Sequence, residues 1–167
     1  MNQTTNQTSN KIAVFVDVQN IYYTVRQAYG CHFNYTAFWN AISSRGQIEH
    51  AFAYAIDRGD RKQQQFQQIL QQIGFEIKLK PYIQRSDGSA KGDWDVGITL
   101  DVVDYAQQVD TVVLASGDGD FDLLLQKVIR DYQVDAEVYG VQALTANSLI
   151  QSATTYYPIE NDLLLKG

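Results

Sequence analysis

The chain has 167 residues, of which 45% are apolar and 19% charged, and a formal net charge of −6. This is the size of one ordinary α/β domain. The longest apolar runs, such as residues 111–115, are too short to cross a bilayer, and no export signal opens the chain, so we expect a cytoplasmic protein without a membrane partner. The single cysteine, Cys31, excludes an internal disulfide framework. The net acidity argues against a broad basic face that grips nucleic acid, but less against a metal enzyme whose carboxylates hold cations.

Residues 1–10 are polar and are predicted to be a disordered tail, and residues 11–167 to form a single domain. Five short β-like runs and five helical segments alternate along that domain. The strands are predicted at residues 12–16, 50–56, 75–79, 112–115 and 136–139. The helices are predicted at residues 21–29, 35–44, 61–73, 96–106 and 121–132. The tail from residue 143 is expected to add a short helix and a last extended piece at 154–157.

This alternation predicts an α/β fold of three α/β/α layers, with a mostly parallel sheet of five or six strands. Right-handed crossovers favour the core order 3-2-1-4-5 for the five predicted strands. The first and fourth strands then become neighbours at the point where the strand order reverses. Ligands of such sheets bind outside the carboxyl ends of those two strands.

Acidic residues follow both of these strand ends. Asp17 ends the first strand, and the segment SGDGDF at residues 116–121 follows the fourth. A third acidic segment, KGDWDV at residues 91–96, opens the helix before the fourth strand. Asp118 and Asp120, like Asp93 and Asp95, could serve only as cap and first-turn acids of their helices. Asp17 resists that reading, because a charge at the end of a buried central strand needs a partner.

Converging carboxylates need a counter-charge. At an effective dielectric of about 20, two of them roughly 4 Å apart repel by about 4 kcal/mol. A hard divalent cation, Mg²⁺ or Mn²⁺, is the natural solution for an all-oxygen set of ligands. Such a site can activate water and stabilise an in-line displacement at phosphorus, so phosphodiester hydrolysis fits it without a protein nucleophile.

Three motifs, FVDVQN at 15–20, KGDWDVG at 91–97 continuing to Asp101, and SGDGDF at 116–121, carry a family resemblance. With them the chain resembles the LabA-like branch of the NYN domain family, within the PIN-like nuclease superfamily, over residues 11–157. The resemblance implies a PIN-like fold and a metal-assisted ribonuclease that acts on single-stranded RNA. It implies that Asn20 orients water or substrate and that Ser116 lies beside the metal or a phosphate. The implied metal ligands are Asp17, Asp95, Asp118 and Asp120.

Among the acids of the second motif, the resemblance favours Asp95 over Asp93, because Asp95 lies six residues before Asp101. Asp101 itself falls on a recurrent acid of the family, but is equally compatible with a surface or helix-packing role. Candidate contacts to substrate phosphates, besides Ser116, are the basic side chains near the strand ends. These are Arg58, Lys91, and, as weaker candidates, Arg61 and Lys62.

Two other functions stay open at this point. A haloacid-dehalogenase-like phosphatase also places an Asp after its first strand, but Gln19 stands where its second acid belongs. A non-catalytic RNA-binding or regulatory protein could retain the same acidic pocket. The oligomeric state is also open, a homodimer included.

Overall fold

The fold was examined in a computed structural model, which describes residues 10–81, 83–84, 90–91 and 93–166. The strands are β1 Lys11–Asp17, β2 His32–Phe33, β3 Gln47–Asp57, β4 Glu76–Pro81, β5 Ile83–Gln84, β6 Ala90–Lys91, β7 Thr111–Ala115, β8 Asp135–Gly140, β9 Thr155–Pro158 and β10 Leu164–Leu165. The helices are α1 Val18–Tyr29, α2 Tyr35–Ser43, α3 Arg61–Ile73, α4 Asp95–Ala106, α5 Asp122–Tyr132 and α6 Asn147–Ser152. Three 3-10 turns complete the elements: η1 Gly119–Phe121, η2 Gln142–Leu144 and η3 Asn161–Leu163.

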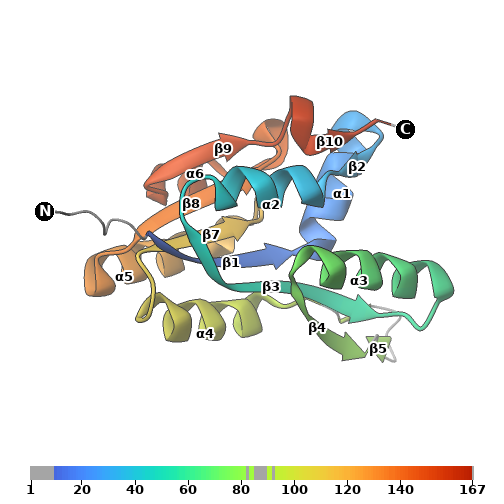
Figure 1. The fold of residues 1–167 in the computed structure, drawn as a ribbon, viewed down its shortest axis with the longest axis horizontal. Coiled ribbons are helices and arrows are strands. Elements are labelled where there is room, and N and C mark those ends of the chain that lie inside the picture. Colours follow the sequence, from blue (N-terminus) through green and yellow to red (C-terminus); the bar gives the residue numbers. More distant parts are fainter. Residues whose placement is uncertain (1–9, 82, 85–89, 92, 167) are drawn as a thin grey trace, which may run out of the picture.

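The main sheet has six parallel strands in the order β4-β3-β1-β7-β8-β9 (Figure 1). This confirms the order predicted for the five strands expected from the sequence, which are β1, β3, β4, β7 and β8 in the structure. It adds β9, where the sequence indicated a last extended piece. The predicted three-layer α/β/α class is also confirmed. Two short antiparallel pairs, β2 with β10 and β5 with β6, were not predicted, because two-residue strands leave no periodic pattern.

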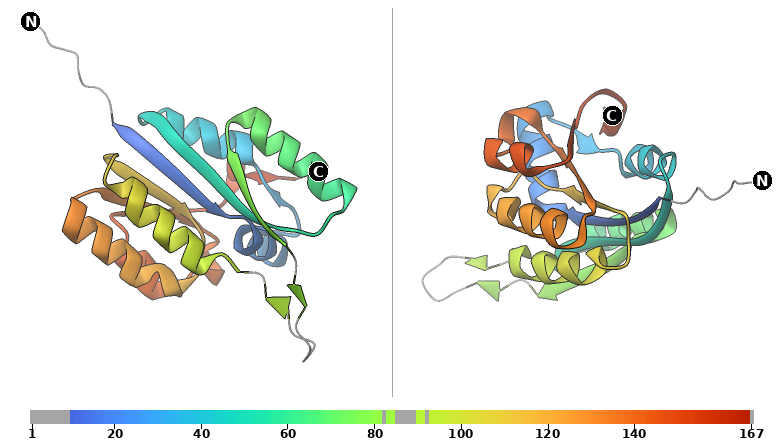
Figure 2. Two further views of the ribbon diagram at one scale, coloured as in Figure 1. Left: turned by 90° about the horizontal axis from the view of Figure 1, so that it is seen from below. Right: turned by 90° about the vertical axis from the view of Figure 1, so that its left-hand side faces the viewer.

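Helices cover both faces of the sheet (Figure 2). One core cluster packs α1, α2 and α3 against the sheet, and the other packs α4, α5 and α6 against the opposite face. α3 shows how narrow the contact of a surface helix is. Phe66, Leu70 and Ile73 pack inward, whereas Ile69, next to Leu70 in the sequence, is 53% exposed.

Helix starts differ from the predicted ones where a side chain caps them. α1 begins at Val18, three residues earlier than predicted, because the Asp17 carboxylate accepts a hydrogen bond from the backbone N–H of Asn20. The predicted helix at 121–132 is preceded by the turn η1, which Asp118 caps. Asp17 and Asp118 therefore have two roles. Each caps the helix or turn that follows it, and each lies at the carboxyl edge of the sheet.

The predicted disordered tail at 1–10 falls outside the described part of the chain, except for Asn10. Within the described residues, no helix is both long and apolar enough to cross a membrane.

Candidate metal centre

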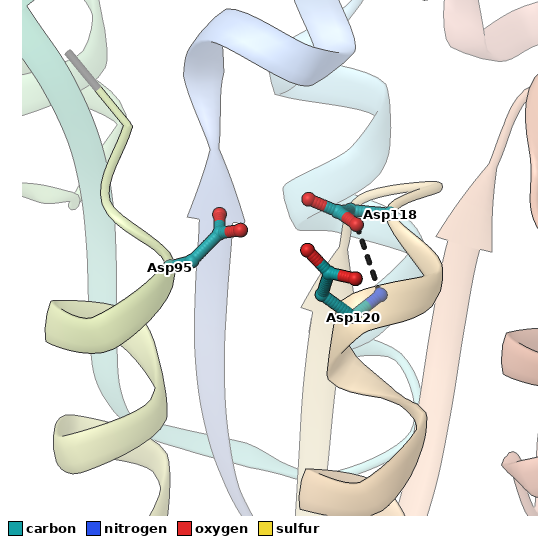
Figure 3. A group of neighbouring side chains, drawn as sticks. All are labelled: Asp95, Asp118 and Asp120. Carbon is teal, nitrogen blue, oxygen red and sulfur yellow. Dashed lines mark hydrogen bonds between the residues drawn. The ribbon is translucent and has the colours of Figure 1, made fainter. Parts of the chain in front are cut away.

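Three carboxylates meet at the carboxyl end of the sheet, beside the ends of β1 and β7. Asp95 reaches in from the first turn of α4, and Asp118 and Asp120 from the segment after β7 (Figure 3). One carboxylate oxygen from each of them lies within 4.8 Å of the others. The structure thus brings together three of the four predicted metal ligands, from two different parts of the chain.

The segment after β7 is held in shape by its own side chains. Asp118 accepts a hydrogen bond of 2.9 Å from the backbone N–H of Asp120, and the hydroxyl of Ser116 accepts one of 3.2 Å from the N–H of Asp118. Gly117 allows a close passage, because a Cβ there would lie 2.8 Å from the carbonyl oxygen of Leu144. These contacts set the angle at which Asp118 and Asp120 leave the strand.

Asp17, the fourth predicted ligand, lies behind this group and is only 8% exposed. Its carboxylate accepts hydrogen bonds from the hydroxyl of Ser116, at 3.3 Å, and from the backbone N–H of Asn20. Burial raises the pKa of Asp17 to about 6, although these two hydrogen bonds lower it, and the nearby charge of Asp118 adds to the rise. Asp17 is therefore linked to the group through Ser116, and direct ligation by it stays a prediction.

Asn20 connects the start of α1 to the same segment. Its side-chain oxygen accepts a hydrogen bond of 2.9 Å from the backbone N–H of Gly117. With that oxygen engaged, the amide presents its N–H groups as donors. The structure thus brings Asn20 to the edge where the sequence placed it, and its role toward water or substrate stays a prediction.

Asp95 has a strongly raised pKa. Burial first, then the adjacent Asp118 carboxylate, and with smaller effects Asp93 and Asp17, together raise its pKa to about 7. All of these causes act against the ionised form, so the metal-free centre holds its charges at a cost. Asp93, the substitute for Asp95, is exposed and accepts a hydrogen bond of 3.2 Å from the Asp95 N–H.

Trp94 and Lys80 anchor the start of α4 and were not singled out from the sequence. The indole N–H of Trp94 donates to the carbonyl of Ala55 on β3, at 2.9 Å. The ammonium of Lys80 lies 4.6 Å from the Trp94 ring centroid and donates to the carbonyl of Asp93, at 3.0 Å. The available signal was the position of Lys80 near the end of the third predicted strand, since the carboxyl ends of parallel strands face the ligand site.

The other predicted site residues lie outside the group of carboxylates. Asp101 pairs with Lys78, at 2.7 Å, and accepts a hydrogen bond of 2.8 Å from the Tyr54 hydroxyl, so it joins α4 to the sheet. This agrees with the helix-packing alternative for that acid. Arg58 is exposed after β3. The side chain of Lys91 falls outside the described residues, and phosphate contacts by these basic residues stay predictions.

The chemistry of the donors fits a hard divalent cation. Three carboxylates offer only oxygen ligands, as Mg²⁺ and Mn²⁺ prefer. Burial and the neighbouring Asp118 raise the pKa of Asp95, and a cation bound beside it would favour its ionised form. A parallel α/β sheet with such a cluster at its switch point is the architecture of PIN-like, metal-dependent nuclease domains.

Comparison with known proteins identifies the family. The NYN domain model matches residues 11–160, so the chain belongs to the NYN domain family, whose members are generally nucleases. It is 28% identical over 162 residues to the "Low amplitude and bright protein LabA" of Synechococcus elongatus, covering 92% of this chain and 86% of LabA. The crystal structure of a Vibrio parahaemolyticus protein of unknown function superposes with a TM-score of 0.92 at 51% identity, covering 97% of this chain and all of that one.

The raised pKa values predict how the stability of the metal-free protein depends on pH. A carboxyl with a higher pKa in the folded chain than in the unfolded chain binds its proton more tightly when folded. Its stabilising effect is therefore complete below about pH 4 and is lost as the pH rises through about 6 for Asp17 and about 7 for Asp95. In EDTA, the Tm should fall between pH 5 and pH 8.

Thermal unfolding by circular dichroism across that range checks this expectation. In the Asp95→Asn variant the Tm should depend less steeply on pH. Asp104 is an exposed acid on the same helix, and Asp104→Asn should keep the wild-type dependence of Tm on pH. A wild-type Tm that stayed level or rose from pH 5 to pH 8 would contradict the assignment.

Proposed function

We propose that this protein is a divalent-metal-dependent ribonuclease, which hydrolyses phosphodiester bonds in single-stranded RNA. The observation that carries the proposal is the convergence of Asp95, Asp118 and Asp120 at the switch point of a parallel sheet. Membership of the NYN family, whose members are generally nucleases, supports the same reaction. Hydrolysis by activated water needs no protein nucleophile, and the centre offers oxygen ligands for the cation that would activate it.

The carboxylates of Asp95, Asp118 and Asp120 would hold Mg²⁺ or Mn²⁺, with Asp17 completing the negative field from behind. When bound, the cation supplies a water of lowered pKa and a positive charge for the phosphate oxygens. Ser116 fixes the carboxylate of Asp17 by donating to it and fixes the Asp118 backbone by accepting from it. The protein's own contribution is thus a preorganised set of acids that stays in place before substrate arrives.

Two further side chains suit the handling of substrate. The N–H groups of Asn20 can donate to a phosphate oxygen or to water, because its oxygen is engaged by Gly117. Lys80 lies beside the backbone of Asp93 at the rim of the centre and can neutralise an approaching phosphate. Neither residue needs to move its backbone to do so, since both are anchored to the sheet or to the acidic segment.

The geometry of Asp17 disfavours the phosphatase alternative. A phosphatase of that kind needs this carboxylate to attack phosphorus as a nucleophile. Here both of its oxygens accept hydrogen bonds, one from Asn20 and one from Ser116, and the residue is buried. A carboxylate held in this way is suited to structural and electrostatic roles.

Cleavage of a labelled single-stranded RNA in the presence of Mn²⁺ or Mg²⁺ tests the proposal. The wild-type protein should cleave, EDTA should stop it, and Asp118→Asn should lower the rate about a hundredfold or more, as is usual when charge stabilisation at the reacting group is lost. Asp104→Asn should retain the wild-type rate, because this acid is exposed on α4 away from the group.

A wild-type protein that binds RNA without cleaving it, with either metal and across several sequences, would sink the ribonuclease proposal in favour of a binding or regulatory role. Equal cleavage by wild type and Asp118→Asn would mean that the activity belongs to a contaminant.

Metal binding can be measured separately from catalysis. Titration calorimetry with Mn²⁺ at pH 7.5 should give a specific heat of binding, and the cation should raise the Tm, because it binds only the folded chain. Asp95→Asn should weaken binding about tenfold or more, whereas Asp104→Asn should not. Loss of affinity in neither variant, or no calorimetric signal in the wild type, would count against a metal at this cluster.

A further inference from the structure

The acidic residues are distributed unevenly between the two helical layers. Residues 18–48 contain no aspartate or glutamate, although the chain has 19 such residues. None of the helices α1, α2 and α3 carries an acid, and together they carry Arg26, Arg61 and Lys62. The opposite layer is different, since α4 alone carries three acids and no base. Glu160 and Asp162, beside η3, are exposed acids that also belong to the layer of α1. A polyanion therefore meets the least repulsion along α1 itself, which carries Arg26 and no acid.

Exposed aromatic side chains stand on α1 in that same layer. Tyr22 and Tyr23 are 41% and 53% exposed and lie edge to face, with ring centroids 5.3 Å apart. The guanidinium of Arg26 donates to the Tyr22 hydroxyl at 3.0 Å, and the ring of His32 stacks on Tyr22 with centroids 6.0 Å apart. We call these four residues the tyrosine platform.

The platform is continuous with the candidate metal centre. α1 begins directly after Asp17, and Tyr23 lies three residues beyond Asn20, so the two side chains are neighbours one helical turn apart. The amide of Asn20 accepts from Gly117, in the segment that carries the acids. One helix thus carries both Asn20, which is bonded to the acidic segment, and the exposed rings in its next turn.

We propose that the tyrosine platform is a stacking site for an unpaired nucleobase of a single-stranded nucleic acid whose backbone crosses the metal centre. This inference rests on the proposed function and adds to it where the substrate is held and in what form. Tyr23, the more exposed of the two tyrosines, stacks on the base, and Arg26 contacts the adjacent phosphate. Tyr22 and His32 support Tyr23 and Arg26 from beneath.

Stacking resolves the problem that the net charge poses. A chain with a net charge of −6 cannot hold a polyanion mainly through released counterions. An aromatic ring stacked against a base adds affinity without any net charge. Such a ring selects single strands, because in a duplex each base face is already covered by its neighbours. A short stretch of stacked, unpaired nucleotides is the ligand that this surface fits.

Fluorescence anisotropy with labelled oligouridylate tests the platform, using Asp118→Asn protein and Mg²⁺ so that cleavage does not intervene. Tyr23→Ala should weaken binding about tenfold. Tyr23→Phe should bind like the parent, because it keeps the ring. An oligomer of abasic sugar–phosphate should bind as weakly to the parent as the oligouridylate does to Tyr23→Ala, with no further loss when the two changes are combined.

Two more measurements separate stacking from general effects. Leu123→Ala removes an equally prominent apolar side chain, 72% exposed on α5 in the acidic layer, and should leave binding unchanged. Arg26→Gln should reduce the slope of log affinity against log salt by about 0.7, the value for one phosphate contact on a single strand. A matched duplex should compete poorly with the oligouridylate.

The outcomes distinguish this inference from the proposed function. Full affinity in Tyr23→Ala, or equal binding of the abasic oligomer and the oligouridylate, would overturn the platform, even if the wild type cleaves RNA. A wild-type dimer in sedimentation that Tyr23→Ala makes monomeric would also overturn it, because a second copy of the chain would then occupy the rings. If oligouridylate binding depends on the Tyr23 ring but the wild type does not cleave RNA, the platform is supported and the ribonuclease proposal is rejected.

Discussion

The candidate site depends on one interaction, the mutual repulsion of the carboxylates gathered at the ends of β1 and β7. A parallel sheet with its strand order reversed between β1 and β7 brings the residues after both strands to one edge. Asp17 is the last residue of β1, Asp118 follows β7, and α4 adds Asp95 from a third segment. The fold thus concentrates carboxylates at one point, where burial, and after it the charges of the neighbouring carboxylates, raise the pKa values of Asp17 and Asp95.

The helix termini offset only a small part of that repulsion. Both α4 and the turn that leads into α5 begin at the acidic group, so the positive ends of their dipoles favour the ionised carboxylates. Such an interaction contributes about 0.3–1 kcal/mol at each terminus. Repulsion between two carboxylates at close range is about 4 kcal/mol at an effective dielectric of about 20, and three carboxylates form three such pairs. The balance has to come from a proton or a cation, and near neutral pH a divalent cation is the more effective of the two.

The fold and the centre of the site were predictable from sequence because their signals are local. Apolar runs mark the strands, and an acid directly after a buried strand has to lie at the edge of the sheet, as Asp17 and Asp118 do. Asp101 is different, because only the rotation of α4 about its axis decides whether that acid faces the centre or Lys78. Trp94 and Lys80 escaped notice for a related reason. Their importance lies in a contact between β4 and the start of α4, which no spacing along the chain encodes.

The uneven distribution of charge gives the proposed reaction an order of events. Without its cation the centre repels a phosphate backbone, and α1, a helix without acids, can attract only a strand that lies away from the carboxylates. The carboxylates of Asp95, Asp118 and Asp120 would hold the divalent cation, and their neutralisation would let the same strand extend from the tyrosine platform across the centre. In the proposed reaction each ligand would then favour the binding of the other, because a coupling free energy between two sites is reciprocal. The repulsion between the carboxylates would in this way make the binding of nucleic acid depend on the metal.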